Sequence, residues 1–111
     1  MNSVIATESL IAKRVDEDPF ELKIEIGTPY KVGSDPEEWA CPVALRPLYQ
    51  RLHDAHGRNS FQSLCLAASL VLDLLQGFIE RGGSLTFPNG DSFPLEAYSF
   101  GAGTKRSGGA A

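Results

Sequence analysis

The chain has 111 residues, 42% of them hydrophobic, and a formal net charge of −4 at pH 7. That length suits one domain with a core that needs neither disulfides nor a metal. Residues 1–100 hold eight Lys and Arg against fourteen Asp and Glu, so this part carries −6 and residues 101–111 add +2. An acidic domain repels phosphate backbones at long range, which argues against general nucleic-acid binding.

Composition also characterises the two ends of the chain. Residues 101–111 (GAGTKRSGGAA) are rich in Gly, Ser and Ala, so we expect a flexible tail after a single domain that spans residues 1–100. The opening MNSVIATESLIAKR lacks the basic start and unbroken apolar stretch of a signal peptide. Two cysteines do not define a disulfide framework. We therefore expect a cytoplasmic protein.

The first 38 residues predict a hairpin followed by a loop. Residues 3–14 contain enough β-branched side chains for a strand, and DEDP at 16–19 predicts a turn. FELKIEI at 20–26 alternates strictly between apolar and polar side chains, as a half-buried antiparallel strand does. Residues 31–38 predict a loop, in which SDPEE could begin a single helical turn.

The segment EEWACPVAL contains a third predicted strand, residues 39–45. Trp39, Cys41, Val43 and Leu45 would share one face, so Cys41 is expected to be a small buried apolar group and not a reactive thiol. Pro42 has no N–H to donate, which places it at an edge or a bulge. RPLYQRLHDAHG at 46–57 predicts a short helix, although an irregular loop explains these residues nearly as well.

The strongest predicted element is a helix over residues 60–81. Asn59 is its expected cap, Gln62 completes a capping box, and Gly82-Gly83 ends it. Apolar residues, Cys65 among them, cover most of its circumference. A narrow polar line remains: Gln62, Ser69, Asp73, Gln76 and Glu80. We expect burial on several sides, against a sheet and a partner chain. No membrane contact is predicted, because the apolar run LCLAASLVLDLL is short and contains Asp73.

A second hairpin is predicted after this helix. Leu85 and Phe87 lead into PNGD, Asn89-Gly90 favours a tight primed turn, and residues 93–97 lead out, with Pro94 marking an edge. The order βββ-α-ββ predicts an α+β fold with an antiparallel sheet of about five short strands and one long helix packed on it. The alternative is an Sm-like bent small barrel with the helix between strands 3 and 4.

Candidate site residues lie between positions 46 and 58. The predicted binding residues are Arg46, Tyr49, Arg51 and Arg58, a basic stretch with an aromatic ring that is opposed only by Asp54.

Metal ligation and catalysis have weaker candidates. His53 and His56, three positions apart on the predicted helix, would need a third ligand such as Asp54, Cys41 or Cys65, so they are weak metal candidates. Ser60 follows His53 in sequence without a G-x-S-x-G elbow, so no catalytic residue is assigned. No cofactor is predicted.

Four stretches of the chain, GTPY, EWACPV, NSFQSLCLA and FPNGDSFPLEAY, together resemble a known family. They are similar to a family of small uncharacterised bacterial proteins with a Trp-x-Cys-Pro stretch and a Ser-Phe-Gln-x-Leu helix start. The resemblance covers most of residues 20–98. It implies a bacterial, cytoplasmic, single-domain protein and no particular activity.

Three functions are compatible with these features. The predicted one is a non-enzymatic binding or regulatory module that acts through protein contacts as a homodimer, since the helix is so widely apolar and no catalytic set converges. One alternative is an Sm-like RNA-binding module that uses Arg46, Tyr49, Arg51 and Arg58. The other is a metal-binding protein or enzyme that uses His53 and His56.

Overall fold

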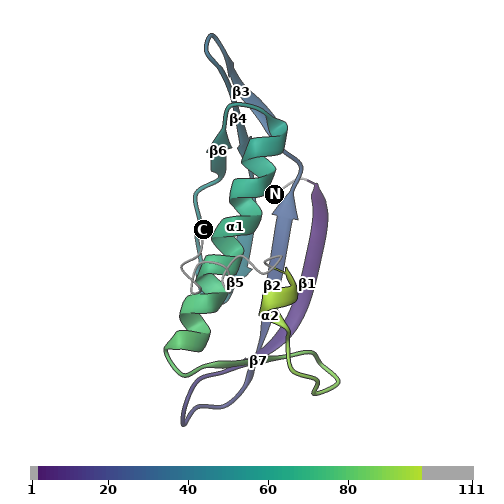
Figure 1. Cartoon of the computed structure of the whole chain (residues 1–111), viewed down its shortest axis with the longest axis vertical. Helices are drawn as coiled ribbons and strands as arrows, with labels where there is room; N and C mark the ends of the chain where they lie inside the picture. The colour runs from purple at the N-terminus through teal and green to yellow at the C-terminus, as the bar shows by residue number, and fades with distance from the viewer. Residues whose placement is uncertain (1–2, 99–111) are drawn as a thin grey trace, which may run out of the picture.

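One long helix lies across two antiparallel sheets in a computed structural model that describes residues 3–98 (Figure 1). The four-stranded sheet has the order β5-β2-β1-β7, and the three-stranded sheet has the order β3-β4-β6. The element bounds are β1 Val4–Lys13, β2 Phe20–Gly27, β3 Tyr30–Ser34, β4 Glu37–Cys41, β5 Val43–Arg46, β6 Ala55–Gly57, α1 Ser60–Glu80, β7 Ser84–Thr86 and α2 Leu95–Tyr98.

This arrangement confirms the predicted α+β class, with antiparallel sheets and one long helix packed on them. Both sheets are open, so the Sm-like barrel is wrong for the described residues. The predicted order βββ-α-ββ is also wrong, because six strands precede α1 and one strand follows it. The predicted tail, residues 101–111, lies outside the described residues.

The first hairpin forms as predicted. β1 pairs antiparallel with β2, so that Leu10 lies opposite Leu22 and Ala12 opposite Phe20. Leu22 and Ile24 are buried, whereas the intervening Lys23 is exposed. Strict alternation is therefore sufficient to orient this strand, because one face of the hairpin packs on the core and the other meets water.

The predicted loop 31–38 and the single strand 39–45 are both wrong. β3 and β4 form a hairpin, with Tyr30 opposite Ala40, so the proposed helical turn at SDPEE is absent. β2 leads through Pro29 into β3, and β4 leads through Pro42 into β5, as the two arms of one long hairpin. Because proline cannot donate to a ladder, the pairing breaks at these positions and each arm passes from one sheet to the other.

The break in pairing at Pro29 and Pro42 forms a corner in the long hairpin. This corner also changes which side chains are buried along 39–45. Trp39 is only half-buried and its indole N–H donates to the Glu37 carboxylate (2.7 Å). Ala40 and Ala44, which the alternation would have placed on the outer face, are buried. Cys41, Val43 and Leu45 are buried as predicted. A period of two holds only within one continuous strand, so the pattern read across Pro42 misplaces Trp39 and the two alanines.

The predicted helix over 46–57 is wrong. Residues Ala55–Gly57 form β6, which completes the three-stranded sheet by pairing Ala55 with Cys41 and Gly57 with Trp39. Gly57 also lies directly against the start of α1: a Cβ atom there would stand 2.7 Å from the backbone nitrogen of Ser63. Long-range pairing with β4 and this close approach outweigh the weak local helical pattern.

The predicted long helix is confirmed, with Asn59 Oδ1 accepting from the Gln62 N–H (2.8 Å). The Gln62 side chain accepts from the Arg58 N–H (2.7 Å) rather than from Asn59, one residue before the expected capping-box partner. Gly82 and Gly83 donate to the carbonyls of Ile79 and Phe78 and end the helix.

Burial of α1 is confined to one face and not spread over several sides. The buried residues are Ser63, Ala67, Val71, Leu75 and Phe78. The predicted polar line is exposed, and so is Cys65. By length and composition α1 would also pass as a membrane span, which is weak evidence because core helices do the same.

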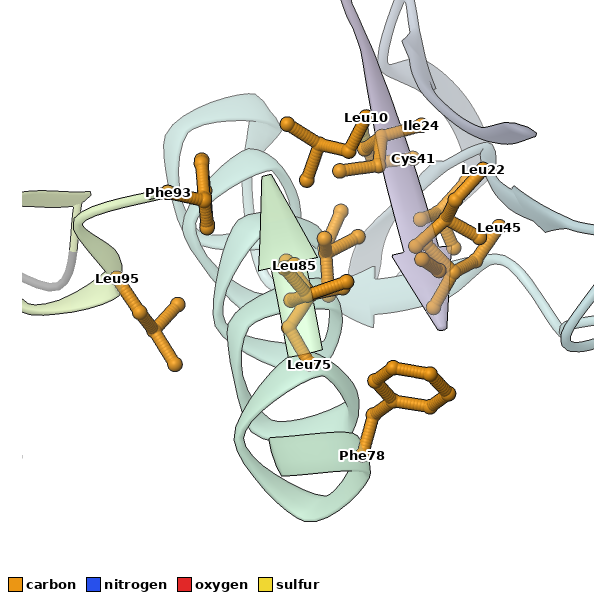
Figure 2. Close-up of a cluster of buried hydrophobic side chains, with 14 residues drawn as sticks. Leu10, Leu22, Ile24, Cys41, Leu45, Leu75, Phe78, Leu85, Phe93 and Leu95 are labelled. Atoms are coloured by element: carbon orange, nitrogen blue, oxygen red, sulfur yellow. The ribbon is translucent and has the colours of Figure 1, made fainter. Parts of the chain in front are cut away.

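The core lies between α1 and the four-stranded sheet (Figure 2). Its fully buried large side chains include Leu10, Leu22, Leu45 and Leu75. Phe78 packs edge-on against Phe20, with ring centroids 6.4 Å apart. These contacts join β1, β2 and β5 to the helix and hold the lower part of the molecule in Figure 1 together.

The predicted second hairpin is only partly confirmed. β7 pairs with β1, but the returning segment makes a single bridge, Ser92 to Thr86, and then forms α2. Gly90 has a positive φ of 97° and Asn89 does not, so the turn is not of the primed type. Asn89 instead accepts from the Asp91 N–H (2.9 Å), as Asn does in Asx turns.

Candidate binding pocket

A pocket of about 820 Å³ opens beside the corner of the long hairpin. One wall is formed by Thr28, Pro29 and Tyr30, and another by residues 42–44 with Arg46. The segment 49–54 completes the pocket, and it is tied back to β5 because the Tyr49 N–H donates to the Leu45 carbonyl (2.9 Å). Most of the residues that line the pocket therefore belong to 39–57, which the sequence misassigned.

Three of the four predicted binding residues meet in this pocket. Arg46, Tyr49 and Arg51 line it, whereas Arg58 lies outside, immediately before the cap of α1. Tyr49 is half-buried and both arginines are exposed, so a cationic and an aromatic group face the same space. The sequence grouped these residues as one basic stretch with an aromatic ring, and their closeness along the chain was sufficient to bring three of them together.

The two histidines are separated. His53 lines the pocket, while His56 Nδ1 lies 2.5 Å from a Glu38 carboxylate oxygen, across the β4–β6 pair. The helical spacing that was expected to bring both rings to one metal does not exist, because the chain is extended at β6. Within residues 3–98, no group of three His, Cys, Asp or Glu side chains is placed to hold a metal ion.

Charge in the pocket is unevenly balanced. Arg46 lies 3.2 Å from Glu25, and the Tyr30 hydroxyl donates to the Asp54 carboxylate. That hydrogen bond raises the pKa of Tyr30, with smaller contributions from burial and from the negative charge of Asp54. Arg51 has no carboxylate partner within residues 3–98. The pocket therefore offers one unpaired guanidinium group to an anion.

Cys41 lies near the corner but inside the core, as predicted. Its side chain is fully buried, and Sγ donates to the Gly27 carbonyl (3.4 Å). Burial raises the pKa of this thiol, and the charge of Asp54 adds to the effect. A buried thiol held in its neutral form is a packing group and not a nucleophile.

Sequence reasoning missed Tyr30, and it considered Asp54 only as a charge within the basic stretch and as a possible metal ligand. They lie 24 positions apart, and only the hairpin corner brings them together. Ser60 begins α1 and its carbonyl accepts from the Ser63 hydroxyl (3.0 Å); no hydrogen bond joins Ser60 to His53 in the part of the chain that the structure describes. Within residues 3–98, no serine or cysteine side chain is hydrogen-bonded to a histidine.

No family model, curated protein or solved structure matches this chain. The resemblance to a family of small bacterial proteins therefore stays a prediction.

Proposed function

We propose that the protein is a non-enzymatic binding module whose pocket holds an acidic segment of a protein partner. The observation that supports this is the convergence of Arg46, Tyr49 and Arg51 on one pocket. A cytoplasmic location agrees with this role and is part of the proposal.

The chemistry of the pocket fits a carboxylate-bearing peptide. A guanidinium group binds a carboxylate through two parallel hydrogen bonds, and such charge-assisted bonds are stronger than neutral ones. Arg51 is free to make them, while Tyr49 offers an aromatic ring beside it. The volume of about 820 Å³ accommodates a few side chains and excludes a folded domain.

RNA is a second candidate ligand, favoured by the same convergence of two arginines and a tyrosine. A phosphate would use Arg51 as a carboxylate does, and a base could stack on Tyr49. The net charge of −4 opposes a long polyanion more than a short acidic peptide.

A titration of the isotope-labelled protein with hexaglutamate, followed by nuclear magnetic resonance, tests the proposal. We expect amide shifts in residues 46–54 and a loss of affinity of about tenfold in Arg51→Ala, which removes one charge-assisted contact. Arg58→Ala is the matched control, because it removes an exposed arginine outside the pocket. Equal losses in the two variants would mean that general charge, and not the pocket, binds the peptide.

Filter binding with single-stranded RNA over a salt series separates the alternatives. RNA affinity that falls in Arg51→Ala and exceeds that for hexaglutamate would replace the peptide proposal with the RNA one. No binding of either probe at low salt would overturn the pocket as a binding site for an anionic chain.

A further inference from the structure

The N-terminal half of β1 has an open edge. β2 pairs with one side of β1 along its length, but β7 pairs with the other side only from Ile11 to Lys13. No strand pairs with that side before Ile11 in residues 3–98. Figure 1 shows this part of β1 at the right-hand margin of the molecule, with no other strand beyond it. A strand edge of this kind is a template for another extended chain.

Backbone groups of Thr7 and Ser9 face this edge. The Leu85 carbonyl accepts from Phe93, so Leu85 faces away from β1, and Thr86 faces β1 opposite Ile11. Alternate residues of a strand turn their N–H and C=O groups to the same side, so Thr7 and Ser9 face the open edge. This alternation ends at the register irregularity between Val4 and Ala6. The Ser9 N–H donates to the neighbouring Glu8 carboxylate (3.2 Å) and not to another strand.

The open edge of β1 carries less of the usual protection against pairing than β3 does. β3, an edge strand of the other sheet, carries Lys31 and a register irregularity after it, two features that hinder association. The β1 edge has one irregularity, at Ile5, and no lysine, arginine or proline before Lys13. Val4 and Ile5 are 43% and 50% exposed, so apolar surface accompanies the unpaired backbone.

We propose that this edge pairs antiparallel with the same edge of a second copy of the chain, so that the four-stranded sheets of two molecules become continuous. A two-fold axis at Thr7 places Thr7 opposite the partner's Thr7. It also places the irregularity at Ile5 opposite the partner's Ser9.

Charge supports a second copy as the occupant. Glu8 is the only charged residue from Val4 to Ala12, and in this register it faces the partner's Ala6, so the two carboxylates are not directly opposed. The interface begins at Val4, directly after Ser3 of the pocket lining, but the remaining pocket residues lie on other segments. The pairing does not depend on what the pocket binds.

The long helix is the competing surface for a homodimer. Phe61 and Leu66 are 74% and 44% exposed, but they lie five positions apart, which is about 140° around the helix. Gln62 and Ser69 of the polar line lie between them. The exposed apolar residues of α1 therefore do not form one stripe, and the β1 edge is the better interface.

Sedimentation equilibrium over a range of concentrations tests the pairing. We expect the wild type to approach twice its 12.0 kDa chain mass. Thr7→Lys places two like charges opposite each other at the two-fold axis and should raise the dimer dissociation constant by at least about tenfold. Val32→Lys adds the same charge to an exposed position on β3, and it should leave the dimer unchanged.

Two further variants identify the interface. Glu8→Ala frees the Ser9 N–H for the partner strand and should tighten the dimer, and a looser dimer would contradict the proposed pairing. Leu66→Glu should have no effect, and if it alone yields monomers, the helix is the interface. A monomeric wild type, or equal behaviour of Thr7→Lys and Val32→Lys with unchanged circular dichroism, would also overturn the proposal.

Discussion

The hydrophobic core and the pocket meet at the corner formed by Pro42 and β5, and they differ in what holds them together. On one side, Cys41 and Leu45 are fully buried among side chains from β1, β2 and α1. On the other, Arg46 and Arg51 are exposed and line a pocket held by a few polar contacts. Dense apolar packing supplies stability, whereas exposed polar groups contribute little to it and remain available for a ligand. Substitutions should therefore separate folding from binding across this corner.

The largest effect is expected for Leu75→Ala. Leu75 is fully buried on the face that α1 turns to the sheets, and its truncation leaves a cavity. The free energy of unfolding should fall by about 3 kcal/mol, measured by urea denaturation. Arg51→Ala should change it by less than about 0.5 kcal/mol. Comparable losses in the two variants would remove the distinction between the two regions.

A smaller loss is expected for Gly57→Ala, which tests how closely β6 approaches the helix. The added Cβ would stand 2.7 Å from backbone nitrogen of Ser63, so either β6 or the first turn of α1 must shift. We expect a loss of about 1–3 kcal/mol in urea denaturation. Gly33→Ala is the control, because a Cβ there meets its nearest atom at 3.4 Å. Equal stability of the two variants would contradict the close approach.

Alkaline pH should lower the free energy of unfolding, because Cys41 in the core loses its proton there. Burial, and secondarily the charge of Asp54, raises the pKa of this thiol above its value in the unfolded chain. The stability that depends on the neutral thiol is complete below the unfolded pKa of about 8.5 and is lost as pH rises through the folded value.

Urea denaturation at neutral and alkaline pH measures this loss. Cys41→Ala should remove this part of the pH dependence, whereas Cys65→Ala should retain it because Cys65 is exposed. Thiol labelling of the folded protein should modify Cys65 alone. Rapid labelling of Cys41 under the same conditions would mean that the core around Cys41 is accessible to the reagent.

The smallest effect is expected on the pocket side, for Tyr30→Phe. The Tyr30 hydroxyl is exposed, so losing its bond to Asp54 should cost no more than about 0.5 kcal/mol near neutral pH. Spectrophotometric titration reports the coupling directly: the hydrogen bond to Asp54 raises the pKa of Tyr30, and Asp54→Asn should lower it again. The small contribution to stability is lost as pH rises through the raised pKa. An unchanged Tyr30 titration in Asp54→Asn would show that the pair is not formed.

The sequence by itself determined the elements whose signals are local. Alternation over 20–26 oriented β2, the Asn59 cap and Gly82-Gly83 bounded α1, and the polar line through Asp73 identified its outer face. Each of these signals depends on contacts within a few residues along the chain. Arg46, Tyr49 and Arg51 could be grouped for the same reason.

Only the tertiary structure decided where the chain changes sheets. The split of 39–45 at Pro42 and the formation of β6 depend on pairing across the fold, with Tyr30 opposite Ala40 and Cys41 opposite Ala55. The local pattern of a strand does not state which strand it will pair with, because hydrogen-bond partners are chosen by the whole sheet. Tyr30 and Asp54, separated by 24 positions, join the pocket by the same long-range pairing.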